Sequence, residues 1–150
     1  ARYQHLAKDN ITVVPLADDA GHARIIAGRF GSADGAAETF TELNVWDIVL
    51  NSGAGADLDV PASHNLMLVV LRGEVRINGG QSVQASQMAT FERESGNVKV
   101  EAVGGEAKIL LLSGVPIDEP VVGYGPFVMN TEAEIAEVMN EFRSGKFGAV

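Results

Sequence analysis

The chain has 150 residues and a net charge of −9, from 11 basic and 20 acidic side chains, with the apolar content of an ordinary globular domain. An acidic surface repels phosphate groups, so we expect no direct binding to nucleic acid and no docking on an anionic membrane. The absence of cysteine excludes disulfides, zinc–thiolate sites and thiol nucleophiles. It also fits a reducing compartment, and we expect the protein to be cytoplasmic.

Short apolar runs separated by turn residues begin at residue 11. Residues 11–16 predict an edge strand because Pro15 cannot donate a backbone hydrogen bond, and residues 23–30 predict the next strand. Residues 42–50 alternate, which places Trp46 on one face of a strand and Asp47 on the other. Residues 66–71 are apolar throughout, so we expect a strand that is covered on both faces.

Further short strands are predicted along the next part of the chain, at residues 73–77, 82–84, 88–91, 98–103 and 108–112. Asn78-Gly79 is a strong hairpin signal, and turn residues occupy 94–97 and 104–106. Regular spacing of short strands is typical of a sandwich or barrel. The sequence therefore predicts an all-β fold up to about residue 112.

The last part of the chain has a different pattern. Proline and glycine residues predict an extended connector. A helix is then predicted to begin after Thr131, because Thr131 and Glu134 have the spacing of a capping box. Apolar side chains then recur at helical spacing, at Ile135, Val138, Met139 and Phe142. Because one helix cannot bury such a stripe alone, we expect it to dock on the barrel or on another domain.

The connector and the helix carry a family resemblance. Residues 109–122 read ILLLSGVPIDEPVV, and after one glycine residues 124–131 read YGPFVMNT. This resembles the end of pirin-family proteins, in which such a turn leads to YGPFVMNT, an acidic amphipathic helix and a basic, glycine-containing close, here residues 143–148. The start, Arg2-Tyr3-Gln4, is similar to the segment that joins the two pirin barrels, so the resemblance covers essentially the whole chain.

Pirins are two-barrel cupins, and the resemblance implies the architecture of this chain. It implies a single cupin-type antiparallel β-barrel, a double-stranded β-helix or jelly roll, with one C-terminal α-helix. We predict a linker-like segment over residues 1–10, the cupin barrel over residues 11–115, and the connector and C-terminal helix over residues 116–150. The resemblance further implies that the family's metal site, three histidines and one glutamate, lies in the N-terminal barrel. It associates the family with quercetin 2,3-dioxygenase activity and with nuclear co-regulator roles.

A cupin metal site needs a His-x-His pair, a glutamate several residues later and a third histidine on a later strand. His64 stands at the first position, but Leu66 occupies the second, and residues 88–91 contain no histidine. We therefore predict no metal ligand, no catalytic residue and no cofactor in this chain, with iron held only by the N-terminal half of a full pirin. His64 is then a turn histidine that local hydrogen bonds satisfy.

A small barrel can enclose one small molecule, and we consider Trp46, Asp47 and His64 as the lining of such a cavity. Trp46 is otherwise a core residue. Asp47 is a costly unpaired charge if it points into the barrel and an ordinary residue if it points outward, and we favour the outward position. This alternative makes the chain a stand-alone cupin that binds a small ligand.

The connector also holds apolar residues that a barrel core does not explain. Phe127, Val128 and Met129, with the helical stripe Ile135, Val138, Met139 and Phe142, form a candidate interface, since methionine and aromatic residues are enriched at interfaces. They could equally fasten the helix to its own barrel. The leading hypothesis is a metal-free half of a two-cupin protein that partners the N-terminal half or itself. The second is that the chain is part of a metal-dependent quercetin 2,3-dioxygenase.

Overall fold

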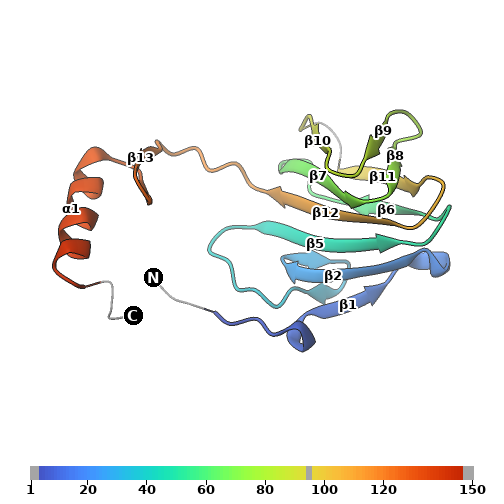
Figure 1. The fold of residues 1–150 in the computed structure, drawn as a ribbon, viewed down its shortest axis with the longest axis horizontal. Helices are drawn as coiled ribbons and strands as arrows, with labels where there is room; N and C mark the ends of the chain where they lie inside the picture. Colours follow the sequence, from blue (N-terminus) through green and yellow to red (C-terminus); the bar gives the residue numbers. More distant parts are fainter. Residues whose placement is uncertain (1–3, 94–95, 147–150) are drawn as a thin grey trace. The chain divides into compact units, whose positions relative to one another are not determined.

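The computed structural model describes residues 4–93 and 96–146 (Figure 1). Its contacts divide the chain into two compact units, Ala1–Pro116 and Ile117–Val150. Several residues named above lie outside the described residues: Arg2, Tyr3, Glu94 and Ser95 of the 94–97 turn, Phe147 and Gly148. No helix in the described part of the chain is long and apolar enough to cross a bilayer.

The first unit consists of two antiparallel sheets. The larger has the strand order β1 (Thr12–Pro15), β2 (Gly21–Ala27), β5 (Leu43–Leu50), β12 (Ala107–Gly114), β7 (Asn65–Arg72) and β10 (Met88–Phe91). The smaller has the order β6 (Gly55–Asp59), β11 (Asn97–Ala102), β8 (Glu74–Ile77) and β9 (Ser82–Gln84). Two 3-10 turns, η1 (Lys8–Asn10) and η2 (Ala17–Asp19), and a short hairpin, β3 (Arg29–Phe30) with β4 (Ala33–Asp34), complete the unit.

The hydrophobic core lies between the two sheets. It is made by inward side chains of both, because alternate residues of a strand point to opposite faces. Trp46 is 1% exposed and packs edge-on against Phe30, with ring centroids 4.9 Å apart. The largest fully buried side chains are Trp46, Ile25, Ile48, Leu50, Leu58, Leu68, Ile109, Leu111, Val70, Val75 and Val100. Side chains therefore fill the interior of the sandwich.

The predicted all-β class is confirmed, and three details differ. Among the described residues no strand pairing joins the two sheets, so the unit is a jelly-roll sandwich rather than a closed barrel. Gly28, with φ 79°, interrupts the strand predicted at residues 23–30. The prediction that residues 66–71 are covered on both faces is wrong. Leu66, Leu68 and Val70 are buried, but Leu71 is 49% exposed, because an antiparallel sheet presents only one face to its core.

The second unit is a hairpin with a helix. The connector predicted as extended pairs with itself as β13 (Val122–Tyr124) and β14 (Phe127–Met129), across a two-residue turn that Gly125 permits with φ 55°. The helix α1 (Glu132–Arg143) begins with the predicted capping box between Thr131 and Glu134. α1 packs on this hairpin, which covers part of its apolar stripe, and docking of the rest on the barrel or on another domain stays a prediction.

Candidate functional site

A buried polar cluster lies at one end of the sandwich, where three neighbouring strands of the larger sheet begin or end. Asn44 lies at the start of β5, Ser113 at the end of β12, and His64 immediately before β7. The register places Ser113 opposite Asn44 on one side and opposite Leu66 on the other. His64, Asn44 and Ser113 are all buried. Strand pairing thus brings together side chains that are far apart in the sequence.

A series of hydrogen bonds joins this cluster to the backbone. The backbone N–H of Arg29 donates to Asn44 Oδ1 at 3.0 Å, which fixes the orientation of the amide. Asn44 Nδ2 then donates to Ser113 Oγ at 3.0 Å. Ser113 Oγ also lies within hydrogen-bond distance of His64 Nδ1, at 3.2 Å, and the tautomer of the imidazole sets which of the two donates.

An exposed carboxylate, that of Glu42, lies beside the other ring nitrogen of His64. His64 Nε2 lies 3.5 Å from Glu42 Oε1, outside hydrogen-bond alignment, and Nε2 has no other protein partner. The order Ser113, His64, Glu42 has the residue types of a hydrolase triad. The Ser113 hydroxyl, however, is buried and also accepts from Asn44. Ser113 is only 7% exposed, and its hydrogen bonds connect the ends of neighbouring strands.

Gly28 sets the geometry of the Arg29 N–H. Its φ of 79° lies in the left-handed region, and a Cβ at this position would overlap Asn44 Oδ1 and the carbonyl oxygen of Leu43. Only glycine allows the backbone to come this close to the amide of Asn44. The break between β2 and β3 at Gly28 is therefore part of the construction of the cluster.

The donor set does not fit the iron that the cupin fold implies. One imidazole and one carboxylate, His64 and Glu42, meet at this end, and the described residues contain no group of three or more His, Asp and Glu side chains. Leu66, at the position of the second ligand, points into the core. Iron in such sites takes at least three protein ligands, usually two histidines and a carboxylate. The described residues therefore supply too few ligands at this end for an iron site of that kind.

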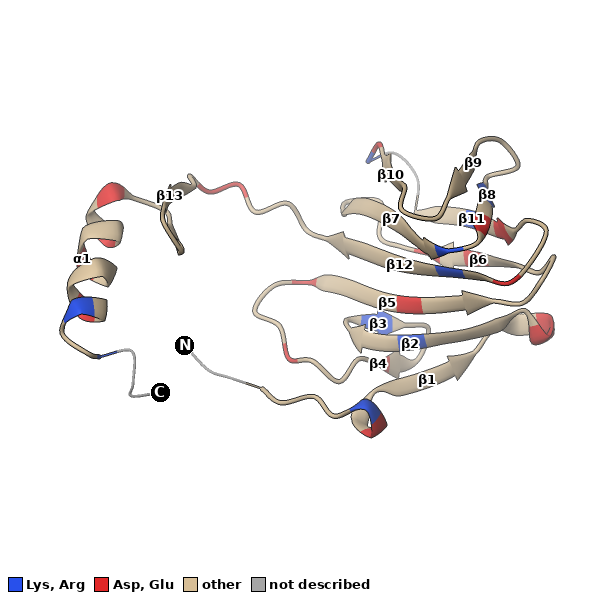
Figure 2. Ribbon diagram, in the orientation of Figure 1, with Lys and Arg blue, Asp and Glu red and all other residues tan. Residues whose placement is uncertain are grey.

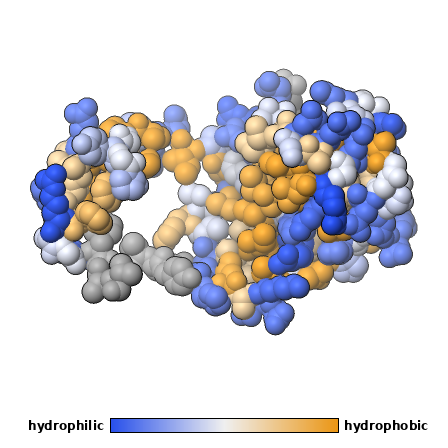
Figure 3. Space-filling view, viewed as in Figure 1, coloured by the Kyte–Doolittle hydropathy of each residue, from blue (hydrophilic) through white to orange (hydrophobic). Residues whose placement is uncertain are grey.

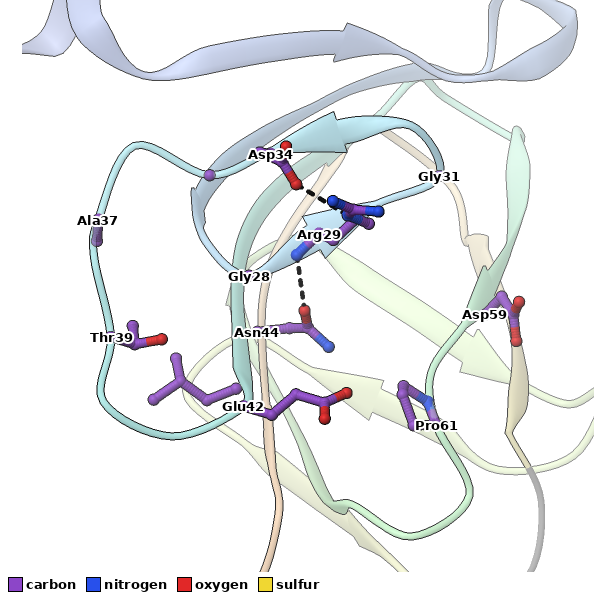
Figure 4. Close-up of a pocket in the computed structure, with 12 residues that line it drawn as sticks. Gly28, Arg29, Gly31, Asp34, Ala37, Thr39, Glu42, Asn44, Asp59 and Pro61 are labelled. Carbon is purple, nitrogen blue, oxygen red and sulfur yellow. Dashed lines mark hydrogen bonds and ion pairs between the residues drawn. The ribbon is translucent and has the colours of Figure 1, made fainter.

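A surface pocket of about 810 Å³ lies beside the cluster (Figure 4). Arg29 projects into it, and its guanidinium is bound to Asp34 at 2.8 Å. Glu42 and Asp59 add further carboxylates, and polar and apolar groups contribute about equally to the lining. Its lining is Gly28, Arg29, Gly31, Asp34, Gly35, Ala37, Thr39, Glu42, Leu43, Asn44, Asp59 and Pro61.

The three residues considered as a cavity lining lie apart. Trp46 is in the core, and a ligand around it would have to displace packed side chains. Asp47 lies on the outer face of β5, as favoured above. There its Oδ2 atom is 3.2 Å from Arg24 Nη1 and 3.1 Å from Lys108 Nζ. Figure 2 shows this acidic position of β5 between basic positions of β2 and β12. His64 belongs to the polar cluster at the end of the sandwich.

The candidate interface residues form two groups within the second unit. Ile135 and Val138 are buried, and Phe127 meets Phe142 edge-on at 5.7 Å between ring centroids. Val128 and Phe142 are exposed by 65% and 60%. The hairpin thus covers one side of the stripe, while apolar surface stays exposed on β14 and at the end of α1.

The sequence analysis missed Asn44, Ser113 and Glu42. The alternation of β5 and β12 contains a signal for two of them, because Asn44 and Ser113 occupy inward positions among apolar neighbours. Asn44 and Ser113 are 69 positions apart in the sequence, and they meet only because β5 pairs with β12, which the alternation within each strand does not encode. Glu42 precedes its strand and carries no comparable signal.

Comparison with known proteins identifies relatives along the whole chain. A candidate quercetin 2,3-dioxygenase of Pseudomonas aeruginosa is 42% identical over 146 residues, which are 97% of this chain and 50% of that protein. A pirin-like protein of Caulobacter vibrioides is 34% identical over 147 residues, 97% of this chain and 52% of that protein. The chain thus spans about half the length of these curated relatives.

A solved structure and a family model agree with these relatives. The crystal structure of a quercetin 2,3-dioxygenase from Acinetobacter baumannii superposes with a TM-score of 0.89 and 42% identity, over 99% of this chain and 51% of that one. The model of the pirin C-terminal cupin domain matches residues 45–148. The chain belongs to the pirin family of the cupin superfamily, and it contains the family's C-terminal cupin domain.

Proposed function

We propose that this chain acts as a metal-free half of a two-part pirin protein, in which it packs against and supports a separate, metal-bearing half. The observation that carries the proposal is the polar cluster at the sandwich end. There His64 Nδ1 is engaged by Ser113, Leu66 replaces a second imidazole, and the interior behind them is filled by core side chains. These contacts support a packing role for this end of the fold.

The proposal extends to the activity of a complete protein. Because the relatives named above as quercetin 2,3-dioxygenases are about twice as long as this chain, we assign any oxygen-dependent cleavage of a flavonol to the other half. Residues of this chain would then act by support and not as ligands. A cysteine-free chain fits a reducing compartment, which supports a cytoplasmic location.

We propose that the hairpin–helix unit contacts the other half. Val128 and Phe142 remain exposed after the hairpin has covered Ile135 and Val138, although both exposed side chains are apolar. Burial of such side chains stabilises an interface by roughly 25 cal/mol per Å² of apolar surface removed from water. The hairpin and the helix would then form a contact surface for the other half.

Metal analysis tests the proposal. Two proteins are purified from iron-supplemented cells: this chain alone, and this sequence placed after the N-terminal half of the P. aeruginosa relative. We expect stoichiometric iron in the tandem protein and only traces in the chain alone. His64→Ala should change neither value. Stoichiometric iron in the chain alone, lost in His64→Ala, would overturn the proposal.

A further inference from the structure

The pocket beside the polar cluster has an excess of negative charge in its lining (Figure 4). Its volume of about 810 Å³ lies within the range of about 300–1,000 Å³ that is usual for sites of small molecules. Figure 3 shows apolar residues gathered over β5, β12 and β7, whereas the pocket lining contains charged side chains. They are one arginine and three carboxylates, which give a net charge of −2: Arg29, Asp34, Glu42 and Asp59. Such a lining attracts a cation and repels an anion.

The arginine compensates only one of the three carboxylates. Arg29 Nε donates to Asp34 Oδ1 at 2.8 Å, which leaves Glu42 and Asp59. Within residues 4–93 and 96–146, no lysine or arginine forms an ion pair with either of these two carboxylates. Glu42 precedes β5 and Asp59 ends β6, so the two carboxylates come from different segments of the lining. A cation between these segments would neutralise part of the remaining charge.

A buried nitrogen atom without a hydrogen bond faces one of these carboxylates. The side chain of His64 is 1% exposed, and its Nε2 atom lies 3.5 Å from Glu42 Oε1, outside hydrogen-bond alignment. Buried polar atoms without a partner are rare because they cost free energy, so this atom is a candidate contact for a bound molecule. The side chain of Glu42 is 72% exposed and points into the pocket toward Pro61 (Figure 4). An exposed side chain changes rotamer readily, so a ligand can settle against Glu42 and His64 Nε2 together.

We propose that this pocket binds a small organic cation, a primary ammonium group on a short alkyl chain. The ammonium would donate to a carboxylate oxygen of Glu42 and to His64 Nε2, and Asp59 would add electrostatic attraction. His64 then carries its own proton on Nδ1 and donates it to Ser113 Oγ, which has a second lone pair for the amide of Asn44. Ligand binding of this kind goes beyond the supporting role proposed above, and it does not depend on that role.

Titration with butylammonium tests the proposal, and butanol and butyrate serve as its neutral and anionic counterparts. Each compound is added to the isotope-labelled chain at constant pH and ionic strength, and amide NMR spectra give the binding site and the Kd. Glu42→Gln and Asp59→Asn each remove one pocket carboxylate and preserve the shape of the side chain. Asp57→Asn is the matched control, because Asp57 is an exposed carboxylate of the same strand, β6, that does not line this pocket. The spectrum of each variant first verifies its fold.

We expect butylammonium to shift the amide signals of residues 35–44 and 59–64 and the ring nitrogen signals of His64, while butanol and butyrate leave them unchanged. The Kd of butylammonium should rise about tenfold in Glu42→Gln and about threefold in Asp59→Asn, and Asp57→Asn should preserve it. Shifts of equal size with butanol, a Kd that Glu42→Gln and Asp59→Asn leave unchanged, or the lack of a saturable shift would each overturn the inference. The iron content of the tandem protein does not depend on this pocket, so failure here leaves the metal-free role standing.

Discussion

The sandwich and the hairpin–helix unit depend on contacts of opposite range. In the sandwich, β12 pairs with β5 and β7, and a hydrogen bond joins Asn44 to Ser113 across 69 positions. In the second unit, Thr131 and Glu134 cap the helix across three positions, and β13 folds back on β14 through a two-residue turn. The unit that carries the family-specific sequence is thus the smaller structure, and the unit with the less specific sequence holds the large core.

Leu111→Ala should cause the largest loss of unfolding free energy, and the loss should be confined to the sandwich. Leu111 is fully buried at the centre of the larger sheet, so its truncation leaves a cavity and costs about 3 kcal/mol of unfolding free energy. The measurement is urea unfolding followed by the fluorescence of Trp46, the only tryptophan. Ile135→Ala in α1 is the matched control. A comparable shift of the Trp46 transition by Ile135→Ala would contradict the separation of the two units.

Gly28→Ala and Gly31→Ala together test whether the close approach of Gly28 to Asn44 requires glycine. Both glycines have positive φ, but a Cβ at Gly31 meets nothing within 4 Å, whereas one at Gly28 overlaps Asn44 and Leu43. We expect Gly31→Ala to cost about 1 kcal/mol through backbone strain alone. Gly28→Ala should cost about 3 kcal/mol through strain and overlap together. Equal losses in the same urea experiment would mean that the close approach at Gly28 contributes nothing.

Thr131→Ala should weaken the second unit and leave the sandwich unchanged. The Thr131 hydroxyl accepts from the backbone N–H of Glu134 at 3.2 Å, and loss of such a cap costs about 1 kcal/mol of helix stability. Hydrogen exchange of the α1 amides measures this loss, with Thr131→Ser as the variant that keeps the hydroxyl. Unchanged exchange in Thr131→Ala would mean that packing on the hairpin alone determines the stability of α1.

Glu101→Gln should have the smallest effect, visible only in acid. The hydrogen bond from Lys99, 2.9 Å away, lowers the pKa of Glu101 below 4.5 and raises the pKa of Lys99 above 10.5. Stability from the lowered pKa is present above pH 4.5 and is lost as the pH falls through the folded-state pKa of Glu101. Stability from the raised pKa of Lys99 is present below pH 10.5 and is lost as the pH rises through its folded-state pKa.

The side chains of Lys99 and Glu101 are 54% and 33% exposed, so solvent screens their interaction and its contribution to stability is weak. The urea midpoint of Glu101→Gln should therefore fall slightly less below pH 4.5 than that of the unmodified chain. Glu137→Gln, on α1, is the control and should reproduce the unmodified curve. An identical acid slope for Glu101→Gln would show that the Lys99 pair does not contribute to stability.

What the sequence predicts well is what is local. The alternation over residues 42–50 placed Trp46 and Asp47 on opposite faces, and the Thr131–Glu134 spacing gave the start of the helix, because both depend on neighbouring residues only. The prediction that residues 66–71 are covered on both faces was wrong, because the sequence shows that both faces of this strand are apolar but not which of them is exposed. The fold of the connector was missed because Gly125 and Pro126 break regular structure as readily as they turn a hairpin.

The candidate site was the hardest to foresee for the same reason. His64 could be singled out from a known ligand spacing, but its partners Ser113 and Asn44 reach it only through the register of three strands. The two cations beside Asp47 likewise come from strands on either side of β5. A list of residues in chain order contains no such lateral information.

The hydroxyl shared at the end of the sandwich also constrains anyone who wishes to redesign it. Ser113 Oγ accepts from the amide of Asn44 and contacts His64 Nδ1. Replacing Ser113 with an apolar residue would therefore leave two buried polar groups without a partner at once. A change at this end of the domain is thus a coordinated change of several strands and not a single substitution.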